Sequence, residues 1–300
     1  MKFPTWTVNP TRRGELAIGP LMILPAALGL CIFQFWPLGV AVLNSFRAFN
    51  PFNHRANGWV GFGNYQSVLA DPTFQSSFWI SLVYMALMIV IIVPSALGLA
   101  ILLDKRMPGT ALARGAILGA LASSEAVAAL IWNAIYQPNS GLLDVIFQTF
   151  GLPSQPFLTS GPLAVVCIVI MTAWKDIGLP MLIFLGALQA IPPHLFEAAS
   201  MDGANRWNKF WRITLPLLRP SLVLGLFMTT IAAARLFTPI QILTAGGPNG
   251  QTSNIAYFSY AQAFLFNSPG PAAASVVLML LMLIVITIIQ ARALRSRSGI

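Results

Sequence analysis

The sequence predicts an all-α membrane protein with six transmembrane helices, and composition and hydropathy carry that prediction. Of its 300 residues, 57% are hydrophobic and only 8% are charged, and the mean hydropathy is +0.76. Soluble domains carry about 25% charged residues, so most of this chain must lie in lipid. Its apolar runs are continuous rather than alternating, which favours spanning helices over a membrane barrel.

Six apolar segments are long enough to cross a bilayer as a helix, which takes roughly 20 residues. We place them at 17–45, 78–103, 111–135, 162–189, 217–241 and 273–293, within one transmembrane domain that covers residues 1–300. The first segment follows a basic N-terminus, as the apolar part of a signal peptide would. It extends well beyond the 7–15 apolar residues of a cleaved signal, so we interpret it as a span.

Basic residues are divided unevenly between the loops, although the net charge is +9. With the N-terminus inside, the cytoplasmic side carries Lys2, Arg12, Arg13, Lys105, Arg106, Arg114, Arg206, Lys209, Arg212, Arg219, Arg292, Arg295 and Arg297. The outer side carries only Arg47 and Arg55. This asymmetry follows the positive-inside rule and predicts that both termini are cytoplasmic. It also explains the net charge without a nucleic-acid partner.

The cytoplasmic loop at 192–216 interrupts the apolar pattern with charge, turn residues and aromatics. The two prolines at its start suit the first turn of a helix, where a missing N–H costs nothing. Asp202-Gly203 is a strong turn signal and should separate two short helices. In the second helix Trp207, Phe210 and Trp211 would share one face, with basic residues on another. Such a helix is suited to a membrane interface.

The same loop contains a long, gap-free sequence pattern, E-A-A-x3-G-x9-I-x-L-P. It is formed by Glu197, Ala198, Ala199, Gly203, Ile213, Leu215 and Pro216. The pattern resembles the cytoplasmic signature of the membrane subunits of binding-protein-dependent ABC importers. This carbohydrate-uptake family includes the maltose and glycerol-phosphate permeases. The resemblance implies the type I ABC importer permease fold, with cytoplasmic coupling helices.

The resemblance also implies an assembly in the bacterial inner membrane. Its other members would be a second homologous permease subunit, two ATP-binding subunits and an extracytoplasmic solute-binding protein. ATP and Mg²⁺ would be used by the ATP-binding subunits, and this chain would bind no cofactor. Coupling to the ATPase would depend on Glu197, Ala198, Ala199, Asp202, Gly203, Ile213, Leu215 and Pro216. Glu197 would be a polar anchor in a docking groove, and Gly203 would provide the required turn.

Two outward loops also resemble the family. The sequence Gly61-Phe62-Gly63-Asn64-Tyr65, and then Asp71-Pro72, precedes the second span, where the family has a G-x-x-N-Y element and a D-P turn. Leu243–Pro248 resembles the family's L-T-x-G-G-P. Its two glycines allow a tight turn where a binding protein could dock. A plain turn between helices is an equally good interpretation of these residues.

The sequence contains no recognisable catalytic or metal-binding set. It lacks a G-x-x-x-x-G-K-[ST] phosphate loop, so the energy for transport must come from another subunit. His54 and His194 fall in loops on opposite sides of the membrane, and Cys31 and Cys167 fall in different spans. Neither pair therefore forms a metal site or a disulfide framework. We predict a permease without catalytic residues.

Four ionisable residues lie inside predicted spans, where each charge costs on the order of 2.5–3.5 kcal/mol. They are Glu125, Lys175, Asp176 and Arg235. With Trp132 and Thr238, we expect them to line a solute pathway, in which the aromatic face suits sugar rings or cationic groups. The alternative is that Lys175 and Asp176 pair with charges on the partner permease. On an ideal helix these two side chains point about 100° apart.

The cations favour a solute that carries a phosphate. Asn50-Pro51-Phe52, after the first span, also resembles the glycerol-phosphate permeases. We therefore favour a glycerophosphodiester, with a neutral oligosaccharide as the alternative. An ion-coupled secondary transporter would be expected to show inverted repeats, and none is evident. A membrane-embedded enzyme would need acid, base or nucleophile groups in one layer, and Glu125 alone does not provide them.

Overall fold

The computed structural model describes residues 22–49, 56–105 and 108–295. Several residues discussed above lie outside these ranges: 17–21 of the first span, Lys2, Arg12, Arg13, the motif at 50–52, His54, Arg55, Arg106 and Arg297. The described chain is almost entirely helical, as the composition predicted. Its one sheet is an antiparallel pair of short strands, β1 (Arg47–Phe49) and β2 (Ala56–Trp59), which the all-α prediction did not include.

Three helices in the described ranges are long and apolar enough to cross a membrane alone. They are Met22–Ser45, which contains the π-helical turn η1 (Cys31–Phe35) and α2 (Trp36–Ser45), then α4 (Pro72–Asp104) and α16 (Pro269–Arg295). Three further candidates are bent pairs: α5 (Thr110–Ala122) with α6 (Glu125–Ile135), α8 (Gly161–Asp176) with α9 (Gly178–Gln189), and Arg206–Leu217 with α13 (Arg219–Ala234). The described residues thus form up to six spans, if each bent pair counts as one.

The bends are the main departure from the unbroken spans predicted at 111–135 and 162–189. The first is a 103° turn between α5 and α6, where Ser123 and Ser124 are both extended. The Ser123 hydroxyl donates to the Ala120 carbonyl at 2.6 Å, which satisfies one acceptor at the end of α5. Serine competes for helical hydrogen bonds in this way, so a pair of serines ends a helix even inside an apolar run.

The second bend, of 46°, lies at Ile177 between α8 and α9, three residues before Pro180. Proline has no N–H to give the carbonyl four residues earlier, at Asp176, so the helical hydrogen bonding is broken there. The span predicted at 217–241 is also interrupted, because α13 ends at Ala234 and α14 (Thr238–Leu243) begins after a short break. Pro239 in the first turn of α14 suits a new helix start.

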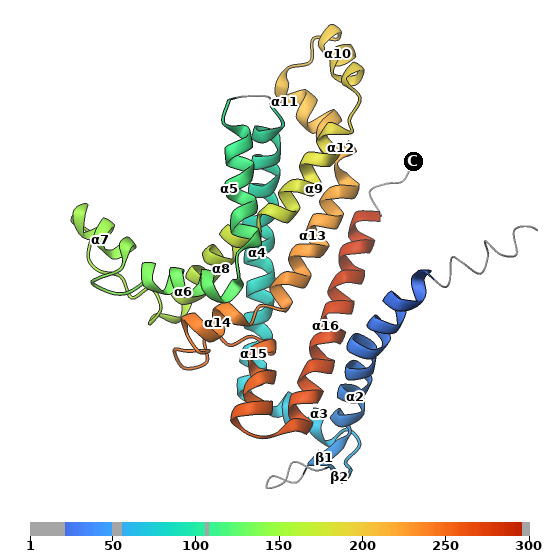
Figure 1. The fold of residues 1–300 in the computed structure, drawn as a ribbon, viewed down its shortest axis with the longest axis vertical. Helices are drawn as coiled ribbons and strands as arrows, with labels where there is room; N and C mark the ends of the chain where they lie inside the picture. The colour runs from blue at the N-terminus through green and yellow to red at the C-terminus, as the bar shows by residue number, and fades with distance from the viewer. Residues whose placement is uncertain (1–21, 50–55, 106–107, 296–300) are drawn as a thin grey trace, which may run out of the picture.

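The helices form an elongated bundle with distinct ends (Figure 1). One end, the α10 end, carries α10 (Pro193–Met201), α11 (Arg206–Lys209), the π-helical turn η2 (Phe210–Thr214) and α12 (Leu215–Leu217). The hairpin end carries β1, β2, α3 (Gly63–Ala70), α15 (Ile255–Tyr260) and the π-helical turn η3 (Ala261–Leu265). Helix α7 (Leu142–Thr149) projects sideways, away from the bundle (Figure 1).

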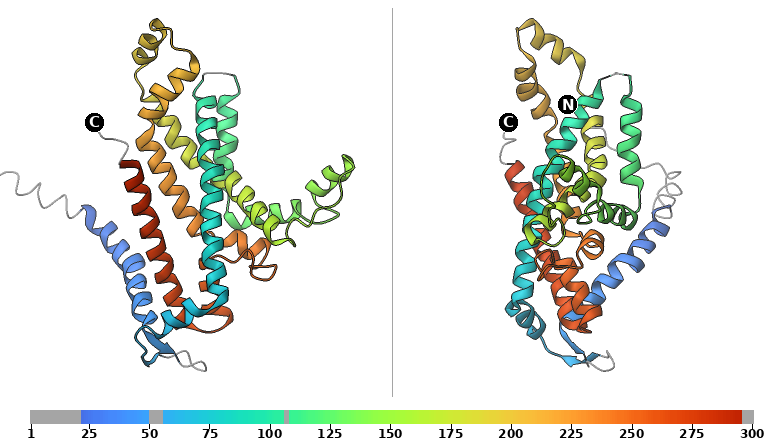
Figure 2. Two further views of the ribbon diagram at one scale, coloured as in Figure 1. Left: turned by 180° about the vertical axis from the view of Figure 1, so that it is seen from behind. Right: turned by 90° about the vertical axis from the view of Figure 1, so that its left-hand side faces the viewer.

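Helix α4 is the centre of packing, and it contacts α8, α9, α13 and α15. Its buried side chains include Tyr84, Met88 and Ile92, each at most 1% exposed. Helix α2 lies at the edge of the bundle, beside α16 (Figure 2), and its apolar stretch buries nothing within the described chain. Such a helix needs lipid or another subunit to cover it.

The G-x-x-N-Y element braces the hairpin end rather than making a simple turn. The Asn64 side-chain amide donates to the carbonyls of Ser45 and Arg47, each at 2.9 Å. The Tyr65 hydroxyl lies 2.6 Å from the Ser45 hydroxyl. These contacts fasten the end of α2 to α3. The D-P element begins α4, where Asp71 accepts from the Thr73 N–H at 2.8 Å.

Candidate functional site

The motif in the loop at 192–216 is divided between an exposed helix and its connection to the bundle. Glu197 and Ala198 are exposed on α10, Ala199 is half-buried, and no residue of α10 is buried. Figure 1 shows α10 at the extreme end of the molecule. Ile213, Leu215 and Pro216 are instead half-buried in η2 and α12, next to α13. The exposed part of the motif is thus connected to a spanning helix by its packed part.

Asp202 and Gly203 end α10, as the sequence predicted. Gly203 has φ of +74°, a backbone conformation that glycine adopts without steric cost. The Gly203 N–H donates to the Ser200 carbonyl at 3.1 Å, and the Ala204 N–H donates to the Ala199 carbonyl at 2.8 Å. This pair of bonds is a Schellman motif, which satisfies the last carbonyls of a helix. Glycine is therefore needed for its conformation, because nothing lies within 4 Å of where its Cβ would be.

The predicted aromatic face after the turn is also present. The rings of Trp207 and Trp211 lie 5.6 Å apart, and Phe210 lies 5.3 Å from Trp211. Trp207 is 67% exposed and Trp211 is 48% exposed. The Lys209 ammonium donates to the Ser200 hydroxyl, which ties this helix to α10. An exposed aromatic cluster beside basic residues suits a lipid headgroup layer.

Five of the six expected pathway residues lie at the helix breaks, which form a second candidate site, here called the break layer. Glu125 is the first residue of α6, Lys175 and Asp176 end α8, Arg235 follows α13, and Thr238 begins α14. The carboxylate of Glu125 lies near Thr238 and interacts electrostatically with the other three charges. Residues far apart in the sequence are thus gathered into one cluster.

Three of the four charges of the break layer match the ends of the helices that carry them, and Asp176, at the negative C-terminal end of α8, does not. Glu125 lies at the positive N-terminal end of α6. Lys175 and Arg235 lie at the negative C-terminal ends of α8 and α13. Each placement is worth about 0.3–1 kcal/mol near a surface. Helix breaks therefore reduce the cost of carrying ionised groups at this depth.

Trp132 belongs to an aromatic wall beside these charges. Its ring lies 5.8 Å from Trp174 of α8 and 5.3 Å from Tyr136. Trp174 is 44% exposed, so the wall is open on one side. Asp176 lines a small cavity of about 180 Å³ with Pro180 and Thr229.

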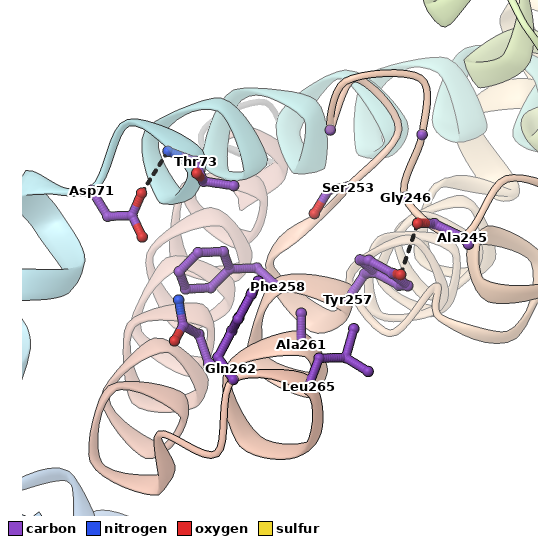
Figure 3. A pocket seen from close by; sticks show the side chains of 13 residues that line it. Asp71, Thr73, Ala245, Gly246, Ser253, Tyr257, Phe258, Ala261, Gln262 and Leu265 are labelled. Carbon is purple, nitrogen blue, oxygen red and sulfur yellow. Dashed lines mark hydrogen bonds between the residues drawn. The ribbon is translucent and has the colours of Figure 1, made fainter. Parts of the chain in front are cut away.

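A larger cavity, of about 490 Å³, opens at the hairpin end (Figure 3). It lies between the start of α4, where Asp71 and Thr73 are found, and the segment from Ala245 to Phe266. The Tyr257 hydroxyl donates to the Ala245 carbonyl at 2.8 Å and closes one wall (Figure 3). Gly246 of the L-T-x-G-G-P element packs so closely on Tyr257 that a Cβ there would lie 2.5 Å from its ring. This element therefore shapes a cavity as well as a turn.

The sequence pattern did not identify Asn254, which is fully buried. Its amide donates to the Leu236 carbonyl at 2.6 Å, and its side-chain oxygen accepts from the Tyr257 N–H at 2.9 Å. Asn254 therefore connects the break after α13 to the start of α15. An asparagine before an apolar run does signal a helix start, but its distant contact with Leu236 leaves no mark in the sequence.

Metal binding finds no support in the described part of the chain. No group of three or more His, Cys, Asp or Glu residues could hold an ion there. Cys31 is exposed on the first helix, and Cys167 is buried in α8.

Comparison with known proteins identifies the family. Residues 63–298 match the family described as binding-protein-dependent transport system inner membrane component. The sn-glycerol-3-phosphate transport system permease protein UgpA of Rhizobium meliloti is 31% identical over 278 residues, which cover 92% of this chain and 94% of that protein. The trehalose/maltose permease protein MalF of Thermococcus litoralis is 32% identical over 247 residues, 82% of this chain and 83% of its own.

The fold itself matches a solved ABC importer. A chain of a bacterial ABC transporter that imports the acidic polysaccharide alginate superimposes with a TM-score of 0.81 at 20% identity. The match covers 96% of this chain and 98% of that chain. With the helical bundle and the family match, it shows that this chain is a multi-pass inner-membrane protein. The chain belongs to the inner membrane components of binding-protein-dependent transport systems, as the non-catalytic permease of an ABC importer.

Proposed function

We propose that this chain forms half of the translocation pathway for a glycerol-phosphate type of solute, with a glycerophosphodiester favoured, and that α10 couples it to ATP hydrolysis. A second homologous permease would complete the pathway. Two ATP-binding subunits would bind ATP and Mg²⁺, and this chain would bind no cofactor. The solute-binding protein would deliver the solute at the hairpin end.

The observation that carries the coupling proposal is the exposure of α10. The helix ends the molecule, buries none of its side chains, and presents Glu197 and Ala198 outward. A short helix that buries none of its side chains in its own chain is suited to a groove on another subunit. Its link to α13 through Ile213, Leu215 and Pro216 supplies the route by which ATPase closure would move a span.

The solute proposal has two supports. Four of the relatives named UgpA, from four organisms, are 30–32% identical to this chain over nearly its full length. The break layer also supplies the exposed guanidinium of Arg235. The wall of Trp132 and Trp174 equally suits a sugar ring, so a neutral oligosaccharide is the second candidate, in line with the MalF relative.

The orientation proposal follows from charge. Among the residues that the structure describes, the α10 end and its neighbouring loops carry most of the basic residues, which the positive-inside rule places in the cytoplasm. The hairpin end, with its cavity of about 490 Å³, would then face the solute-binding protein. Both termini would be cytoplasmic.

Coupling is tested by two substitutions in the reconstituted complex. We expect Glu197→Arg and Gly203→Pro to leave the chain in the membrane but to abolish ATP-dependent uptake. Arginine reverses the charge in the docking groove, and proline cannot adopt the positive φ of the turn. The control is Asn208→Arg, which introduces an arginine on the exposed surface of α11 at a position that is not part of the E-A-A-x3-G-x9-I-x-L-P pattern. Normal uptake by both variants would refute coupling through α10.

The solute class is tested by ATPase stimulation in lipid, with the solute-binding protein present. A panel of glycerophosphodiesters is compared with neutral disaccharides. We expect stimulation by the phosphodiesters. Stimulation by disaccharides alone would replace this solute assignment with the oligosaccharide one.

A further inference from the structure

The break layer contains two cations, and the structure gives them different surroundings. The Lys175 ammonium lies 3.5 Å from the Asp176 carboxylate, and the two side chains are 13% and 30% exposed. They are neighbours on the last turn of α8, where the helix bends, and they pair despite the ideal-helix expectation that they point apart. Lys175 is therefore already neutralised within its own chain, by a partner that moves with it.

Arg235 has no such partner. Its side chain is exposed, and in the described parts of the chain its guanidinium makes no hydrogen bond or ion pair. Its guanidinium is attracted to Glu125 at longer range. An exposed guanidinium inside a span is too costly to face lipid, so it must face a watery cavity or another subunit.

Glu125 carries the opposite charge in the same layer. Its carboxylate lies near Thr238, on the helix that follows Arg235, and it is attracted by Arg235 and Lys175 and repelled by Asp176. A carboxylate that attracts this guanidinium at longer range balances its charge without occupying its hydrogen-bond donors.

We propose that Arg235 binds the anionic group of the solute, and that Glu125 balances the charge of Arg235 while no solute is bound. Lys175 and Asp176 form a structural pair that holds the bend between α8 and α9. Guanidinium presents a planar fork of donors that fits two oxygens of a phosphate, which an ammonium cannot do. This assignment rests on the proposed solute class and adds the residue that recognises it.

Three variants begin to separate recognition from a merely structural role. The measurement is uptake of a radiolabelled glycerophosphodiester by the complete complex in proteoliposomes, with thermal stability and stimulated ATPase recorded alongside. We expect Arg235→Gln to lower uptake about 10- to 100-fold, the effect of losing a charge-assisted pair of bonds. Arg235→Lys should recover part of the loss, because it restores the charge but not the fork. Arg292→Gln makes the same chemical change at an exposed arginine of α16, outside the break layer.

The double variant decides between the two roles of the Glu125–Arg235 attraction. If Arg235 recognises the solute, Glu125→Gln alone lowers uptake less than Arg235→Gln does, and the double variant is as defective as Arg235→Gln. If the two residues only form a structural pair, either single change is equally harmful and the double variant restores uptake. Restoration would overturn the proposal.

The remaining outcomes distinguish this inference from the proposed solute. Lys175→Gln/Asp176→Asn should act mainly on the thermal stability of the complex. If that variant loses uptake like Arg235→Gln while remaining stable, the assignment of a structural pair is wrong. If the wild-type complex takes up phosphodiesters and Arg235→Gln takes them up equally well, the role of Arg235 is overturned but the proposed solute class stands. Uptake of neutral disaccharides alone by the wild-type complex overturns both proposals.

Discussion

Single residues with a capping side chain or an unusual backbone conformation act mainly where helices begin and end. Asp71 starts α4, Asn254 starts α15, and Gly203 closes α10. In lipid a backbone group without a partner costs several kcal/mol, so every break in a span must be satisfied locally. The residues that do so also determine where side chains of opposite charge meet.

Gly246 offers a test at this scale. It combines φ of +79° with a packed environment, and a Cβ would meet the Tyr257 ring at 2.5 Å. Gly250 has a similar φ of +75° but nothing within 4 Å. We expect Gly250→Ala to cost about 1 kcal/mol of backbone strain. Gly246→Ala should cost a further 1–3 kcal/mol or so, because the ring must move.

Thermal unfolding of the purified complex measures this difference. The Gly246→Ala variant should have the lower midpoint and also the weaker binding of the solute-binding protein. Equal midpoints for the two variants would show that the cavity wall yields easily and that only backbone conformation matters.

At the scale of elements, the sideways position of α7 depends on one buried carboxylate. Asp144 is 0% exposed and accepts from the Asn139 N–H at 2.7 Å, the Gln148 amide at 3.1 Å and the Gln155 N–H at 3.2 Å. Burial raises the pKa of Asp144, but these bonds and one from Ser154 together hold the pKa below its ordinary value. The carboxylate therefore stabilises the fold of this loop.

The pH dependence of the loop follows from that direction. The pKa of Asp144 is lower when folded than the unfolded value of about 3.9, so the folded loop binds fewer protons. Its stabilisation is complete above the unfolded pKa and is lost as the pH falls through the folded pKa. We expect hydrogen exchange of residues 139–157, corrected for intrinsic rates, to accelerate over that acidic range.

Asp144→Asn is the matched variant, because it keeps the shape and removes the titration. Its loop should be less protected at neutral pH and should show no further loss on acidification. Acid-induced opening of equal size in both proteins would mean that another group controls this loop.

The whole molecule is apolar on its flanks and has three levels along its length. The α10 end, the helices α6 and α14 of the break layer and the hairpin end lie in sequence along the bundle (Figure 1). The surface of α16 is exposed at Leu281, Ile284 and Val285, as expected of a helix in contact with lipid. In the proposed function, these levels would contact the ATPase, the solute and the solute-binding protein.

Orientation is the prediction that belongs to this scale. Met201 on α10 is 89% exposed and Phe62 at the hairpin end is 68% exposed. In intact cells, a membrane-impermeant maleimide should label Phe62→Cys but not Met201→Cys, and permeabilised cells should show both. The parent chain, with Cys31 and Cys167, sets the background. Labelling of Met201→Cys in intact cells would reverse the orientation.

The sequence by itself determined the class of fold, the approximate place of the spans and the family motif with its turn at Gly203. These features depend on composition, on windows of about 20 residues and on a local spacing, all of which the sequence displays directly. It also identified the costly charges inside the spans, because a charge in an apolar run stands out wherever the helix packs.

Only the tertiary structure decided how those residues combine. A hydropathy window averages over a two-residue break, so the turn at Ser123 and Ser124 was invisible in it. The pairing of Lys175 with Asp176, the contact of Glu125 with Thr238 and the free state of Arg235 depend on how three broken helices pack together. Such packing is a property of contacts between distant segments, and no local pattern in the sequence encodes it.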